Sequence, residues 1–112
     1  MDKLVNKIVG IGVPGLMLVV ATSMTGLSGA AAITAALALL GPGGMVGGII
    51  TLVISGAIAS VLAEYGFDAL FEAIVKKLYK KGESKETIRR KIENGPWSEK
   101  LKAKAISELN KL

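Results

Sequence analysis

The chain has 112 residues, of which 51% are hydrophobic and 4% aromatic, and its 14 Lys and Arg residues against 9 Asp and Glu residues give a net charge of +5. It contains neither cysteine nor histidine, which excludes disulfides, thiolate nucleophiles, imidazole bases and zinc sites built from the usual nitrogen and sulfur ligands. Since the remaining acid and base candidates do not converge, the sequence predicts no enzyme, no cofactor and no metal site.

The charged residues are absent from one long segment, residues 8–63 between Lys7 and Glu64. About 20 apolar residues already suffice to cross a bilayer as a helix. Burying this run inside a soluble monomer would require polar-faced helices around it, and the residues after Ala63 are too few and too charged to supply them. We therefore expect an all-α integral membrane protein whose first partner is the lipid bilayer.

Taken in chain order, a short basic leader at residues 1–7 precedes three apolar segments at 8–24, 26–40 and 45–63. The first can kink at Pro14 and Gly15, and the glycine-rich turn at 41–44 separates the second from the third. A single helix over 8–40 would be roughly 50 Å long, which overshoots a hydrocarbon layer of roughly 30 Å. We expect two crossings with a partly sunk middle segment, or three crossings as the alternative.

The remainder of the chain carries its charges on amphipathic helices. Residues 64–81 show apolar residues at three-and-four spacing, and we expect this helix to continue the third membrane helix. Gly82 stops it, Ser84 and Ser98 are caps for two further helices, and residues 82–112 form a charged helical hairpin. The hairpin has too few apolar residues to be stable alone, so we expect it to dock on a neighbour. The heavier cluster of lysines places the C-terminus in the cytoplasm.

Small residues recur at every fourth position of the third segment. In lipid, such a row allows close approach of helix backbones and hydrogen bonds across the seam. It predicts either packing within one hairpin or self-association into a homo-oligomer. The row consists of Gly43, Gly47, Thr51, Ser55, Ala59 and Ala63.

Three carboxylates, Glu64, Asp68 and Glu72, follow the last apolar residue at the same spacing of four. Repeated around an axis, they would form rings of negative charge at the mouth of a pore. The alternative is a solvated helix face on which Glu72 pairs with Lys76.

Basic residues cluster just beyond the membrane region. Their position favours contact with anionic lipid headgroups, with ordinary solubility as the alternative. A regulatory protein or a polyanion is another candidate partner of the tail. Nucleic acid is disfavoured because the acidic residues of the tail weaken its positive electrostatic potential. The contact residues that we predict are Lys76, Lys77, Lys80, Lys81, Arg89 and Arg90.

The stretches TGLSGAAA at residues 25–32 and GGMVGG at 43–48 resemble the glycine- and alanine-rich membrane segment of the interferon-alpha-inducible small membrane proteins. This resemblance implies a small helical membrane protein tied to innate defence and cell death, and it implies no catalytic residues. The second and third segments also resemble the hydrophobic hairpin of colicin-type pore-forming domains, although the soluble helices that surround that hairpin are absent from this sequence.

Together these patterns predict a self-assembling membrane channel or membrane-permeabilising pore, such as a toxin or defence effector, gated by its cytosolic helices. Two alternatives stay open. The hairpin could be a non-conducting anchor or assembly subunit that presents the basic tail to a partner, or the chain could be a soluble oligomer that buries the apolar run in its interface.

Overall fold

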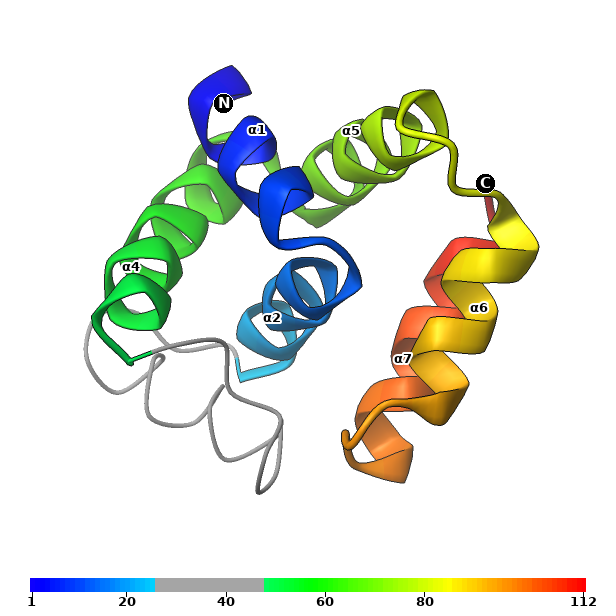
Figure 1. Cartoon of the computed structure of the whole chain (residues 1–112). Coiled ribbons are helices and arrows are strands. Elements are labelled where there is room, and N and C mark those ends of the chain that lie inside the picture. The colour runs from blue at the N-terminus through cyan, green and yellow to red at the C-terminus, as the bar shows by residue number, and fades with distance from the viewer. Residues whose placement is uncertain (26–47) are drawn as a thin grey trace.

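The computed structural model describes the backbone of residues 1–25 and 48–112, and the side chains of residues 1–24 and 56–112. The described residues form helices and no strands, so the predicted all-α class is confirmed. Figure 1 shows α2 in the middle, with the other labelled helices around it. The six helices are α1 (Asp2–Ile11), α2 (Val13–Thr25), α4 (Gly48–Tyr65), α5 (Phe67–Lys80), α6 (Lys85–Asn94) and α7 (Glu99–Asn110).

The central helix α2 is the most deeply buried element. Its side chains from Leu16 to Ala21 are at most 1% exposed. A helix that is apolar on every side has no face for water and must be enclosed, and α2 contacts α1, α4, α5, α6 and α7. The expectation that the residues after Ala63 are too few to cover the neutral run is therefore wrong for α2, because three later helices pack against it.

Amphipathic helices form much of this cover. On α1 and α5 the buried residues recur three and four positions apart, which places them on one helix face, and none of the charged residues of these two helices is buried. Phe71 is the largest fully buried side chain, and its ring lies 5.2 Å from that of Phe67 between centroids. The buried residues are Leu4, Val5, Ile8 and Val9 of α1 and Leu70, Phe71, Ile74, Val75 and Leu78 of α5.

The predicted first membrane segment, 8–24, is not one helix. The chain bends at Gly12, whose φ of 94° and ψ of −150° lie in a region essentially restricted to glycine. The predicted kink at Pro14 and Gly15 is therefore displaced toward the N-terminus. Pro14 lies in the first turn of α2, where its missing N–H leaves no helical hydrogen bond unmade.

A second bend corrects the prediction for residues 64–81. The amphipathic helix does not continue the preceding apolar helix, because α4 ends at Tyr65 and α5 begins at Phe67. Gly66 lies between them with φ 88° and ψ 161°, again a glycine-restricted conformation. This bend lets α5 fold back against α1 and α2, with which it is in contact.

The C-terminal hairpin has the predicted caps. The Ser84 hydroxyl accepts a hydrogen bond from the Thr87 backbone N–H, and the Thr87 hydroxyl accepts one from the Ser84 N–H, which forms a capping box. The Ser98 hydroxyl accepts one from the Leu101 N–H at 3.3 Å. The expectation that the hairpin docks on a neighbour is corrected by the structure, in which α6 and α7 both contact α2 of the same chain.

Among the described residues, no helix is both long and apolar enough to span a membrane. The predicted segment 26–40 lies outside those residues. The predicted segment 45–63 overlaps α4, whose backbone is described from Gly48 onward.

Candidate anion-binding groove

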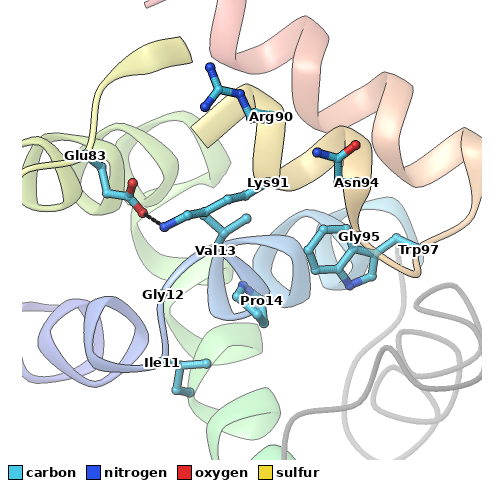
Figure 2. Close-up of a pocket in the computed structure, with 10 residues that line it drawn as sticks. All are labelled: Ile11, Gly12, Val13, Pro14, Glu83, Arg90, Lys91, Asn94, Gly95 and Trp97. Carbon is cyan, nitrogen blue, oxygen red and sulfur yellow. Dashed lines mark hydrogen bonds and ion pairs between the residues drawn. The ribbon is translucent and has the colours of Figure 1, made fainter. Parts of the chain in front are cut away.

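Three adjoining hollows form a groove between the α1–α2 bend, the end of α5 and α6. The hollow drawn in Figure 2 has a volume of about 460 Å³, and ten residues line it. It shares Gly12, Glu83 and Lys91 with the second hollow, which in turn shares Val9 and Lys81 with the third. We call these three hollows together the basic groove.

The C-terminal end of α5 and the turn that leads into α6 form part of the groove. The backbone N–H of Glu83 donates to the Leu78 carbonyl at 3.0 Å, and that of Gly82 donates to the Tyr79 carbonyl at 3.0 Å. This pair of bonds is a Schellman motif, which ends α5 and reverses the chain. The motif places Glu83 immediately before α6, where its carboxylate pairs with Lys91 in the last turn of that helix.

Cationic side chains dominate the polar lining. In the described part of the chain, Lys80, Lys81 and Arg90 form no ion pair. Such a concentration of unneutralised charge around a concave surface attracts anions. The five cationic residues of the groove are Lys77, Lys80, Lys81, Arg90 and Lys91.

Glu83 is the one carboxylate among the described lining residues. Lys91 Nζ lies 2.6 Å from its Oε2, and the Thr87 hydroxyl donates to its Oε1 at 2.9 Å. The hydrogen bond from Lys91 lowers the pKa of Glu83 below its ordinary value, and this effect outweighs burial, which acts in the opposite direction. The carboxylate is therefore ionised at neutral pH and neutralises Lys91.

The other wall of the groove is apolar. Val13 and Trp97 are 2% and 7% exposed, and Figure 2 shows both beside Pro14, away from the Arg90 guanidinium. Gly95 leaves room for the indole, because a Cβ atom at that position would lie 1.9 Å from Trp97 Cζ3. The groove thus combines a cationic side with an apolar side.

The structure divides the predicted lipid-contact residues into two sets. Lys77, Lys80, Lys81 and Arg90 line the groove, and Lys77 Nζ donates a hydrogen bond to Asn6 Oδ1 of α1. The other two lie elsewhere. Lys76 pairs with Glu72 at 2.9 Å, and Arg89 Nη2 donates to Asn110 Oδ1 of α7 at 2.5 Å.

The predicted carboxylate stripe is broken. Glu64 belongs to α4, whereas Asp68 and Glu72 belong to α5, because the bend at Gly66 separates the two helices. The predicted pairing of Glu72 with Lys76 is confirmed. A continuous row of three carboxylates along one helix is therefore wrong for this structure.

Most of the small-residue row cannot be placed. Gly43 and Gly47 lie outside the described residues, and the side chains of Thr51 and Ser55 are outside them as well. Ala59 is half-buried and Ala63 is exposed on α4. Self-association through this row stays a prediction.

Sequence reasoning missed four polar residues of the groove: Asn6, Glu83 in its role as counter-ion, Lys91 and Asn94. Asn6 and Glu83 come from segments that are distant in the sequence, and no local spacing joins them. One sequence feature could have indicated the position of Glu83. Ser84 is a helix cap, so Glu83 lies immediately before α6 and eight residues from Lys91.

The buried carboxylate of Glu108 on α7 leads to a prediction about pH. The residue is 6% exposed. Burial raises its pKa, but hydrogen bonds from Lys104 and Lys111, each at 3.1 Å, outweigh burial and hold the pKa below the ordinary 4.5. Because the folded-state pKa is the lower one, ionised Glu108 stabilises the fold above about pH 4.5 and this contribution is lost as the pH falls.

We therefore expect the free energy of unfolding to fall as the pH drops below about 4.5, and Glu108→Gln to reduce that slope. Denaturant titrations at several pH values measure both effects. Glu99→Gln is the control, since this side chain on the same helix is 94% exposed. Equal slopes in wild type and Glu108→Gln would contradict the assignment.

Comparisons with known proteins yield no match: no protein-family model, no curated protein and no solved structure matches the chain. The two resemblances described from the sequence therefore rest on their own residues alone, and residues 26–32 and 43–47 of those stretches lie outside the described residues.

Proposed function

We propose that the chain inserts into membranes and permeabilises them through self-assembly of its neutral segments. The observation that carries this proposal is the enclosure of α2, whose side chains from Leu16 to Ala21 are at most 1% exposed. Among the helices that enclose it, α1, α5 and α6 bury no charged residue. A chain built in this way has two environments available to its neutral run, the protein core and hydrocarbon. In this proposal α5, α6 and α7 are a cover that separates from α2 at the bilayer.

Both environments suit the apolar side chains of α2. Lipid tails are as apolar as leucine side chains, so moving Leu16, Leu18 and Val20 from the core into hydrocarbon sacrifices little hydrophobic stabilisation. The amphipathic helices then lie in the interface with their apolar faces in the acyl boundary and their lysines toward the headgroups. The exchange requires no ionisable group to enter the membrane, because residues 8–63 carry none.

Helix length explains why the bends matter for insertion. The 13 residues of α2 extend about 20 Å at about 1.5 Å per residue, which is short of a hydrocarbon layer of roughly 30 Å. If Gly12 adopted helical angles, residues 8–25 would form a helix of roughly 27 Å. Straightening at Gly12 is therefore the step that produces a membrane-length first segment.

Inserted chains would meet through the small-residue row that includes Thr51, Ser55 and Ala59. The C-terminal helices would stay on the cytoplasmic side, because lysines near the membrane orient an integral membrane protein. The exposed position of Ala63 and the half-buried position of Ala59 support this arrangement, since part of the row is accessible before insertion.

The test is dye release from vesicles, combined with the oligomeric mass in detergent. We expect the wild type to release dye and to form an oligomer in detergent. Ser55→Leu should reduce the rate of dye release and the association constant by about tenfold each, because a contact across such a seam contributes about 1–2 kcal/mol. Ala57→Leu is the matched control, because Ala57 is exposed on the same helix and lies outside the row. A protein that binds vesicles as a monomer and releases no dye would contradict pore formation and leave the anchor alternative.

A further inference from the structure

The basic groove has the two surfaces that an anionic amphiphile requires. Its cationic side carries Lys80, Lys81 and Lys91, and its apolar side is lined by Val13, Pro14 and Trp97. A small inorganic anion would use only the first surface. A phosphate group attached to an acyl chain would use both, with its oxygens near the lysines and its chain against the apolar wall.

We propose that the basic groove binds the phosphate headgroup of an anionic phospholipid, and that Glu83 occupies Lys91 until the lipid arrives. This site would serve the membrane insertion proposed above, and the choice of a lipid rather than free phosphate as its ligand rests on that proposed function. The proposal assigns the lipid class, the contacting side chains and the internal competitor.

The contacts of Glu83 show how this competition operates. Its Oε2 holds Lys91 at 2.6 Å and its Oε1 accepts from Thr87 at 2.9 Å, so one carboxylate neutralises one of five cations. A phosphate offers more acceptor oxygens and more charge than a carboxylate. It would take the Lys91 ammonium and repel Glu83, which retains its hydrogen bond from Thr87.

The location of the groove connects binding to the bend of the chain. Gly12 lines both the hollow beside Trp97 and the hollow beside Lys81. A lipid seated there lies between the α1–α2 bend and α6, where α6 contacts α2. Headgroup binding would therefore take place at the seam that must open for α2 to reach the bilayer.

Calorimetric titration of the full chain with soluble probes tests the site directly. The probes are dihexanoyl phosphatidic acid below its micelle concentration, glycerol 3-phosphate and dihexanoyl phosphatidylcholine. We expect phosphatidic acid to bind at least about tenfold more tightly than glycerol phosphate, since only the lipid contacts the apolar wall, and we expect no binding of phosphatidylcholine.

Variants separate the groove from the net charge. Lys81→Gln should weaken phosphatidic acid binding by about threefold to tenfold. Glu83→Gln, which keeps an acceptor for Thr87, should strengthen it by a similar factor because Lys91 is released. Lys100→Gln, on the exposed start of α7, removes the same charge outside the groove and should change the affinity by less than about twofold.

Three results would overturn the proposal. They are equal affinities for phosphatidic acid and glycerol phosphate, equal losses for Lys81→Gln and Lys100→Gln, and no gain in affinity for Glu83→Gln. Each is measured without vesicles, so failure of the lipid site is distinguishable from failure of membrane permeabilisation, which dye release measures.

Discussion

Replacing Phe71 with alanine should lower the free energy of unfolding by about 3–5 kcal/mol. The ring is 2% exposed, and it belongs to α5, which contacts α1, α2 and α4. Truncation removes its buried apolar surface and leaves a cavity that the surrounding helices can fill only in part. Since a domain of this size has a total stability of about 5–15 kcal/mol, a large part of the folded population would be lost under mild denaturation.

Chemical denaturation followed by circular dichroism measures this loss. Tyr79→Ala is the matched control on the same helix, because Tyr79 is 38% exposed and its truncation should cost less than about 1 kcal/mol. If the cover holds α2 out of the membrane, Phe71→Ala should also release dye at lower protein concentration than the wild type. Equal stabilities for Phe71→Ala and Tyr79→Ala would show that α5 does not form part of the core.

The second large effect is expected at the bend between α4 and α5. Alanine at position 66 would have to adopt a φ of 88°, which costs on the order of 1–3 kcal/mol for a residue with a Cβ atom. Among the described residues other than the two chain neighbours, no atom lies within 4 Å of the added Cβ, so the cost comes from the backbone conformation. Gly66→Ala should therefore destabilise the bent form and favour one continuous helix through residue 66.

Gly56→Ala provides a control for this substitution within α4. A Cβ atom at position 56 also meets nothing within 4 Å in the part of the chain that the structure describes, and the backbone there is helical, so alanine should stabilise that helix by up to about 1 kcal/mol. We expect Gly66→Ala to unfold at lower denaturant concentration and to release dye at lower protein concentration, and Gly56→Ala to do neither. The bend would be unnecessary to the fold if both variants were equally stable.

Local patterns in the sequence predicted the amphipathic helices and their ends. The apolar spacing within residues 64–81 identified the residues of α5 that are buried, because burial on one face repeats with the helical period. Ser84 and Ser98 were identified as caps because a hydroxyl there satisfies backbone N–H groups that no helix can satisfy internally. Both predictions depend on neighbours in the sequence alone.

The bends and the groove could not be predicted in the same way. Glycine permits the conformations of Gly12 and Gly66 without requiring them, and the packing of α1 and α5 on α2 decides which is adopted. The groove joins Asn6 of α1, Lys81 at the end of α5 and Lys91 of α6, so no spacing within one segment predicts it. Hydropathy also fails to distinguish the two solvents of α2, because a helix that is apolar on every side suits a protein core and a bilayer equally.

The environment of the Met17 methyl group tests the central claim most directly. Met17 is fully buried on α2 and is one of four methionines, so its signal in methyl-labelled protein can be assigned with Met17→Leu. In anionic bilayer discs whose acyl chains carry a nitroxide, we predict that this signal shifts from its position in buffer and broadens strongly because α2 contacts hydrocarbon. A Met17 signal that keeps its buffer position and line width in those discs would contradict the account.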